Sequence, residues 1–174
     1  MRRLRALLKE RMFAPSRTAI HDRLDACAIP FREPIGALVE RYGTHPLGWA
    51  PDIDICVLQD AKPFIATQTG PVVFEIGPET DLQAPPAMLR CAVRKAASPA
   101  LNYARAIADL TKIFGRGEEV PHPERVQRRW SFDGAEMFCS VHPPDRPVSE
   151  ARARRIAMFP DRAHEAAIHI FPNS

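Results

Sequence analysis

The sequence predicts an α+β fold in which one antiparallel sheet is packed by amphipathic helices. Some segments repeat their apolar residues at helical spacing, and others repeat them at every second position. Glycine, proline and aspartate clusters separate the two kinds of segment, as turns do. With 174 residues, 45% of them hydrophobic, the chain is also long enough for one domain with its own core.

The segment from Ser98 to Val141 has the clearest pattern and predicts a helix followed by a hairpin. Ser98 is a favoured helix N-cap, and Pro99 suits the first helical position because the missing amide would have no partner there. Gly115 is the expected stop, since glycine readily adopts the left-handed conformation that ends many helices. Between them, one apolar stripe recurs at spacings of four, three and four residues: Tyr103, Ile107, Leu110 and Phe114.

Two alternating stretches follow and predict a β-hairpin around Asp133-Gly134, a pair that favours tight turns. In residues 125–132 and 137–141, apolar and polar side chains alternate with the period of two that half-buried strands show. We therefore expect the inward-facing residues of this helix and hairpin to belong to the core: Tyr103, Ile107, Leu110, Phe114, Val126, Trp130, Phe132, Met137, Cys139 and Val141.

Weaker patterns predict the remaining elements. Further helices are expected in three places: from Ser16 to Ala28, from Pro34 to a stop at Gly43, and from Ser149 to Met158. Single strands are expected at 53–58, 88–94 and 166–171, and a second hairpin is expected from strands 64–67 and 72–76. The C-terminal half then has the order strand, helix, strand, strand, helix, strand.

The chain divides into a basic N-terminal segment, residues 1–15, and a single α+β domain, residues 16–174. For the first segment, a helix that packs through its leucines is preferred over a partner-binding arm or an amphipathic membrane contact. Residues 34–76 and 98–142 share a helix ending at glycine, a proline-containing loop, a tryptophan and a strand with a cysteine. Either this is an internal duplication of a helix-strand-strand unit, or two amphipathic helices merely share a template.

Composition restricts the classes of function. Lysine and arginine number 24 against 21 acidic residues, so a net charge of +3 argues only weakly for a polyanionic partner. The four cysteines lie far apart among apolar neighbours, which predicts buried free thiols in a reducing cytoplasm: Cys27, Cys56, Cys91 and Cys139. No apolar run approaches the ~20 residues of a membrane-spanning helix, so a cytoplasmic protein is expected. The preference for arginine over lysine, with many alanines and prolines, is typical of a GC-rich bacterial genome.

Two patterns look like catalytic motifs without fitting them. Asp52 and Asp60-Ala61-Lys62 suggest the signature of metal-dependent nucleases, but a continuous strand would hold the two aspartates ~26 Å apart. His164-Glu165 with His169 is one residue too long for the zinc motif HExxH. A phosphate-binding glycine loop, a dinucleotide fingerprint and a nucleophile elbow are also missing from the sequence. We therefore predict no catalytic residue, no metal and no cofactor.

The element order of the C-terminal half is typical of ferredoxin-like domains, which include RNA-recognition domains, so nucleic-acid binding is one alternative. The weak net charge and the lack of a basic-Gly-aromatic-Gly-aromatic pattern on the central strand argue against it. The outward face of the hairpin and the last strand gathers basic and aromatic residues that are common at interfaces. We predict that it is the binding face: Arg125, Arg129, Phe138, His142 and His169.

By elimination, the sequence favours a non-catalytic protein that binds another macromolecule, foremost a protein, as an adaptor, an immunity-type protein or a chaperone-like factor. A small hydrolase with a site assembled from dispersed histidines and carboxylates is the alternative. A pocket that collects two or more of one set of side chains would favour the hydrolase: His122, His142, His164, His169 and Glu165. A shallow face carrying Arg125, Arg129 and Phe138 would favour the binding protein. The identity of the partner and the oligomeric state carry no sequence signal.

Overall fold

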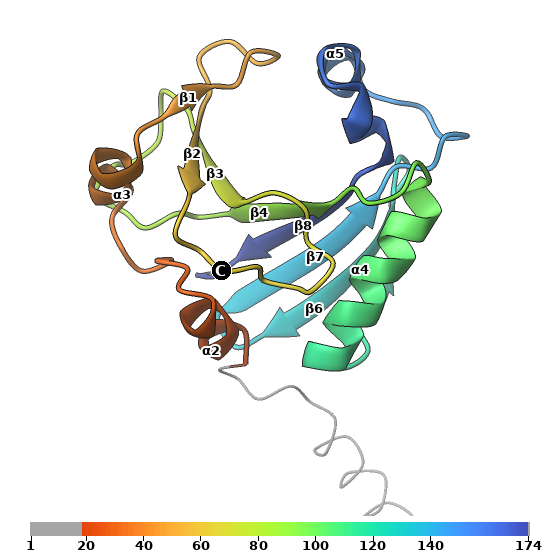
Figure 1. The fold of residues 1–174 in the computed structure, drawn as a ribbon, viewed down its shortest axis with the longest axis horizontal. Helices are drawn as coiled ribbons and strands as arrows, with labels where there is room; N and C mark the ends of the chain where they lie inside the picture. The colour runs from red at the N-terminus through yellow and green to blue at the C-terminus, as the bar shows by residue number, and fades with distance from the viewer. Residues whose placement is uncertain (1–18, 174) are drawn as a thin grey trace, which may run out of the picture.

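A computed structural model describes residues 19–173 of the chain, so the predicted N-terminal segment 1–15 and the N-cap Ser16 lie outside the described residues. Helices and strands alternate in groups along the chain (Figure 1). Their order is α2 (Ala19–Ala26), α3 (Ile35–Tyr42), β1 (His45–Pro46), β2 (Asp54–Leu58), β3 (Val72–Ile76), β4 (Leu89–Val93), α4 (Pro99–Phe114), β5 (Glu118–Val120), β6 (Val126–Phe132), β7 (Ala135–Val141), α5 (Glu150–Met158), the 3-10 helix η1 (Pro160–His164) and β8 (Ala166–Phe171).

All the strands of the described chain belong to one antiparallel sheet, in the order β1-β2-β3-β4-β8-β7-β6-β5. The predicted α+β class, an antiparallel sheet packed by helices, is therefore confirmed. Figure 1 shows the sheet strongly curved, with α2, α3 and α4 on its outer side. The β1 end of the sheet and α5 lie at opposite rims of the curve, on either side of its opening. We call the side covered by α2, α3 and α4 the outer face, and the opposite side the inner face.

The hydrophobic core lies between the outer face and the three helices. Each central strand sends alternate residues into it: Leu89, Cys91 and Val93 from β4, Met137 and Cys139 from β7, and Ala166, Ile168 and Ile170 from β8. All four cysteines are buried free thiols, as predicted, and burial raises the pKa of Cys91 to about 12. Such thiols are unreactive at neutral pH.

Helix α4 confirms its predicted boundaries, because Ser98 caps it by accepting a hydrogen bond from the Leu101 amide and Gly115 follows its last residue. Its fully buried stripe is rotated slightly from the expected one and consists of Asn102, Ala106, Leu110 and Phe114. Tyr103 and Ile107 pack at the margin of that stripe, partly buried against the core.

Two local predictions are wrong. Residues 64–67 form bends and turns instead of a strand, although Phe64 and Ile65 are fully buried. Hydrophobicity fixed their burial without fixing their conformation, and β3 pairs with β2 instead. Val126 is 36% exposed and lies outside the core, because α4 packs on β7, β4 and β8 and leaves the start of β6 uncovered.

The predicted element order of the C-terminal half is observed, with β5 added, but it does not form a ferredoxin-like sheet. A βαβ unit pairs its strands in parallel, whereas β4 and β8 are antiparallel neighbours at the centre of this sheet. The two ends of the sheet mirror each other: α3 precedes β1-β2-β3, and α4 precedes β5-β6-β7. The internal duplication stays a prediction. The two tryptophans do not support it, because Trp130 is in β6 while Trp49 is in the loop before β2.

Candidate functional site

The inner face of the sheet carries the polar side chains that alternate with the core residues. On β8, Ala167 and His169 face inward while their neighbours enter the core, and on β4 the inward positions are Arg90 and Ala92. Within residues 19–173, no layer like that formed by α2, α3 and α4 covers this face. Two segments reach over it: α5 with η1, and the loop 47–53 between β1 and β2.

These two segments meet above the inner face. The guanidinium of Arg155 in α5 lies 5.7 Å from the centre of the Trp49 ring in the loop. A Cβ at Gly48 would lie 3.1 Å from the methyl group of Met158, so the loop and the helix approach closely there. The contact forms a roof that encloses space against the strands below.

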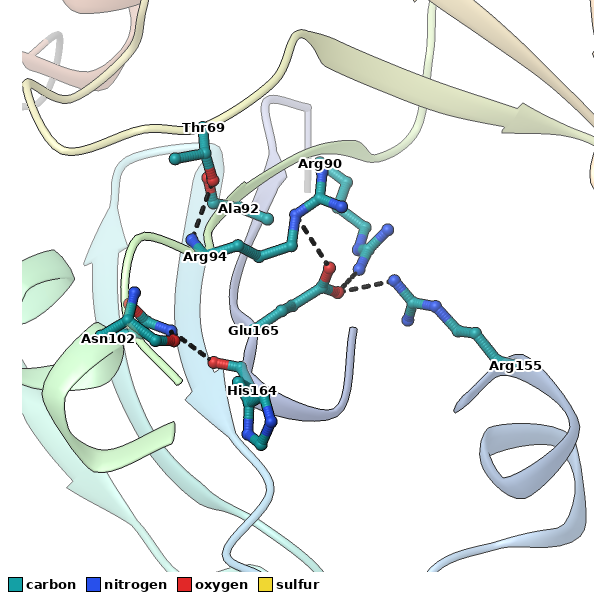
Figure 2. A network of polar contacts seen from close by, with 9 residues as sticks. Thr69, Arg90, Ala92, Arg94, Asn102, Arg155, His164 and Glu165 are labelled. Carbon is teal, nitrogen blue, oxygen red and sulfur yellow. Dashed lines mark hydrogen bonds and ion pairs between the residues drawn. The ribbon is translucent and has the colours of Figure 1, made fainter. Parts of the chain in front are cut away.

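Glu165 is the centre of the polar network under this roof (Figure 2). Its side chain is 2% exposed, and it pairs with the guanidinium groups of Arg90 in β4, Arg94 just after β4 and Arg155 in α5. Arg155 Nη2 donates to Glu165 Oε1 over 2.6 Å, Arg90 donates to the same oxygen, and Arg94 Nε lies 3.8 Å from Oε2. A buried ion pair of this kind depends on every partner, since loss of one leaves the others buried without compensation.

Hydrogen bonds from neighbouring elements fix the strand ends that carry these side chains. The buried Asn102 amide of α4 donates to the His164 carbonyl oxygen over 2.7 Å, just before Glu165 (Figure 2). Directly after β4, the Arg94 backbone amide donates to Thr69 Oγ1 over 2.8 Å. The chain directions at Arg94 and Glu165 are therefore set before any ligand binds.

Two cavities lie on the inner face and share Glu165 as a wall. The cavity under α5 has a volume of about 250 Å³, and the cavity over β2, β3 and β4 has a volume of about 130 Å³. Their walls contain six arginines and three glutamates: Arg90, Arg94, Arg125, Arg152, Arg155, Arg162, Glu75, Glu124 and Glu165. The lining thus has an excess of three positive charges.

This excess contrasts with the charge of the described chain. Residues 1–18 contain six basic residues and one acidic residue, which leaves 18 basic and 20 acidic residues in 19–174. A part of the chain with a small negative charge therefore concentrates positive charge in one recess. Low-dielectric walls around such a recess focus its field on anions.

Burial, together with the crowding of positive charge, lowers the pKa values of Arg155 and His169 in the recess. Burial, together with Arg90, Arg162 and Arg152, lowers the pKa of Arg155 to about 8, and the guanidinium still carries its charge at neutral pH. Burial and the nearby charges of Arg90, Arg125 and Arg155 lower the pKa of His169 to about 3, so its ring is neutral. Every one of these shifts is in the direction that a bound anion would reverse.

Three hydrogen-bond donors around the cavity under α5 have no acceptor among the described residues. Trp49 Nε1, Arg152 Nε and Arg155 Nε are buried and unpartnered among the described residues. Buried donors of native proteins are almost always paired, with protein, water or ligand. All three belong to side chains that line this cavity, where water or a bound group can supply the missing acceptor.

The structure brings together most of the predicted binding face. Arg125, His142 and His169 line the cavity under α5. Phe138 lines a more open hollow of about 310 Å³ that continues from it through Arg125 and His169. Arg129 faces the same side of the sheet, pairs with Glu118 over 2.8 Å and lines none of these three hollows. Its part in the binding face stays a prediction.

The sequence interpretation missed most of the arginines. Arg90 had a signal, because a charge inside a strand of otherwise apolar residues requires a partner in the fold. Trp49, Arg152 and Arg155 had none, since their role depends on a loop and a helix that fold over the sheet from opposite ends.

Within the described residues, histidine, cysteine, aspartate and glutamate side chains nowhere gather in threes that could hold a metal ion. In the same part of the chain, none of the helices is both long enough and apolar enough to cross a membrane. Comparisons with protein-family models, curated proteins and solved structures found no match. The function is therefore argued from the site.

Proposed function

We propose that the protein is a non-catalytic binding protein that holds an acidic segment of a protein partner on its inner face. The observation that carries the proposal is the positive recess in a part of the chain that is otherwise slightly negative. Negative groups of a partner would compensate the arginines that Glu165 alone does not balance. The remaining residues carry a net negative charge, which would repel acidic partners that do not fit into the recess.

The hollow beside Phe138 adds an apolar contact to the charged one. Phe138 and Phe171 meet edge to face there, with ring centres 6.0 Å apart, and Met88 lies in the same wall. Because this hollow and the larger cavity share Arg125, Ser140 and His169, the two contacts are continuous. An extended segment with an acidic residue followed by an apolar one suits this sequence of contacts.

A peptide-binding measurement tests the proposal. A fluorescent peptide of alternating glutamate and leucine should bind saturably, as followed by fluorescence anisotropy, and added salt should weaken it. Arg125→Glu should weaken binding at least about tenfold, because it reverses a charge where the two hollows meet. Arg116→Glu, an equal change of charge at an exposed position after α4, should leave binding unchanged.

Equal losses in the two variants would show an effect of overall charge and would contradict the assignment of the inner face. Tighter binding of a single-stranded oligonucleotide in direct competition would replace the protein partner with a nucleic acid. We favour the peptide because the arginines of the inner face are gathered in one short recess, whereas the evenly spaced phosphates of a nucleic acid need an extended basic surface.

One observation favours the second candidate, a hydrolase. His142, His169 and Glu165 do line one cavity, which is the condition set for a dispersed catalytic site. Their chemistry is less suitable. A histidine with a pKa of about 3 is a weak base, the His142 ring is hydrogen-bonded to the Pro147 carbonyl at 3.0 Å, and Glu165 is held by arginines. Turnover of an ester or amide substrate that His142→Ala abolishes would establish the hydrolase instead.

A further inference from the structure

The cavity under α5 has the dimensions of a subsite. Its volume of about 250 Å³ is below the ~300–1,000 Å³ of sites that enclose a whole small molecule. The cavity is therefore suited to one charged group that belongs to something larger. This inference rests on the proposed function, because a segment lying on the inner face would supply that group.

The donors of the cavity are arranged for oxygen atoms with negative charge. Trp49 contributes a neutral N–H from the loop, and Arg152 and Arg155 contribute charged N–H groups from α5. Glu165 already accepts from Arg155 Nη2, so the unpartnered Arg155 Nε is a separate position on the same guanidinium. Oxyanions match such sets, because each oxygen accepts more than one hydrogen bond and charged donors strengthen it.

The surroundings favour negative charge further. Ser149, Ala151 and Arg152, at the amino-terminal end of α5, line the cavity, and that end of a helix attracts anions. In the described part of the chain, no carboxylate lies within ion-pair distance of the Arg125 or Arg152 side chain, although both line this cavity. Glu165 thus compensates the β4 side of the recess and leaves the α5 side uncompensated.

We propose that Trp49, Arg152 and Arg155 bind one oxyanion group of the partner, a carboxylate or a phosphate, in the cavity under α5. The group enters between the loop 47–53 and α5, accepts the three unpartnered N–H groups, and neutralises the excess charge on the α5 side of Glu165.

The two tryptophans allow a direct test by NMR on the full, nitrogen-15-labelled chain. Trp49 Nε1 is unpartnered, whereas Trp130 Nε1 donates to the Gly115 carbonyl oxygen over 2.9 Å and serves as an internal reference. Inorganic phosphate or malonate, added at constant ionic strength, should shift the Trp49 indole resonance saturably and leave that of Trp130 in place. Trp49→Phe assigns the two signals.

Two variants on the same helix give the matched comparison. Arg152→Gln should weaken anion binding about ten- to hundredfold, the loss expected for a charge-assisted hydrogen bond. Arg154→Gln removes an exposed arginine that pairs with Glu150 and should leave the titration unchanged. The Trp130 resonance shows in each variant that the fold is retained.

Lack of a saturable Trp49 shift with both anions would overturn the proposal, as would an Arg152→Gln titration equal to that of the unaltered chain. A preference for phosphate or for malonate identifies a phosphorylated or a carboxylate side chain as the source, and either supports the site. Peptide binding that depends on Arg125 without any anion titration would refute this subsite alone. Anion titration without peptide binding would refute the proposed function alone.

Discussion

Glu165 determines how the charged residues of the inner face can coexist. Its carboxylate is 2% exposed and binds guanidiniums from Arg90, Arg94 and Arg155. Without it, three partly buried positive charges would face one another in a recess that already contains other arginines. The residue thus combines two roles, since it stabilises the fold and it limits the positive field that a ligand meets.

Glu165→Gln should therefore lower the free energy of unfolding by about 3 kcal/mol or more, because removal of one partner leaves the others uncompensated. Urea unfolding followed by circular dichroism measures the change. Glu150→Gln is the control, since Glu150 is 80% exposed and its partner among the described residues is Arg154 on the same helix, so the change should stay within about 0.5 kcal/mol. Similar small effects in both variants would show that the network does not contribute to stability.

At the scale of elements, the connection between α4 and β5 packs closely against β6 at Gly117. Gly117 lies against the Trp130 ring, and a Cβ there would lie 2.6 Å from Trp130 Cε2 and 2.7 Å from the Arg129 carbonyl oxygen. The backbone of Arg129 is part of the β6 ladder and cannot yield easily. Glycine is therefore required at this position for close approach.

Gly117→Ala should destabilise the protein by about 1–3 kcal/mol, the range for inserting a group into a packed site. Gly77→Ala offers a matched comparison, because nothing lies within 4 Å of its added Cβ and its φ is not positive. Thermal unfolding of the two variants, each compared with the unaltered chain, measures the difference. Equal melting temperatures would mean that β5 and its turn shift without cost.

The elements also show where sequence patterns succeed. Ser98, the stripe around Leu110 and Gly115 predicted α4 because caps and helical periodicity are local properties. The β6-β7 hairpin was predicted for the same reason, since Asp133-Gly134 favours the turn. Residues 64–67 were misassigned because a short buried apolar run does not distinguish a strand from an irregular segment.

At the scale of the whole molecule, the site depends on convergence that no local pattern encodes. Alternation along β7 and β8 placed Phe138, His142 and His169 on one face correctly. The roof came from segments about 100 residues apart, the loop with Trp49 and the helix with Arg155, and periodicity does not tell which face of a sheet a connection covers. The site residues carried by the strands could thus be predicted from the sequence, whereas those of the loop and of α5 could not.

The field of the whole recess should appear in the pH dependence of stability. His169 faces Arg90 of β4, Arg155 of α5 and Arg125, and with burial these lower its pKa to about 3, below the ~6.5 of an unfolded chain. Between these two values the unfolded state binds more protons, so acidification through this window favours unfolding. We expect the urea midpoint to fall as the pH is lowered from 7 to 4.

His169→Gln should flatten this slope, because its side chain does not titrate. His45→Gln changes an exposed histidine of β1 and should leave the slope as it is. The measurement is a series of urea titrations across the pH range for all three proteins. A slope that is the same in His169→Gln as in the unaltered chain would contradict the buried, neutral state of His169.

The pairing of β4 with β8 at the centre of the sheet also has a consequence for chain entropy. Most neighbouring strands are joined by connections of moderate length, but Val93 pairs with Ala166 across about 70 residues. Loop-closure entropy grows only with the logarithm of loop length, so this pairing costs about 2 kcal/mol more than closing a loop of about 10 residues. The β4–β8 pairing, at this small entropic cost, therefore joins β1-β2-β3-β4 and β8-β7-β6-β5 into the single curved sheet on which the arginines converge.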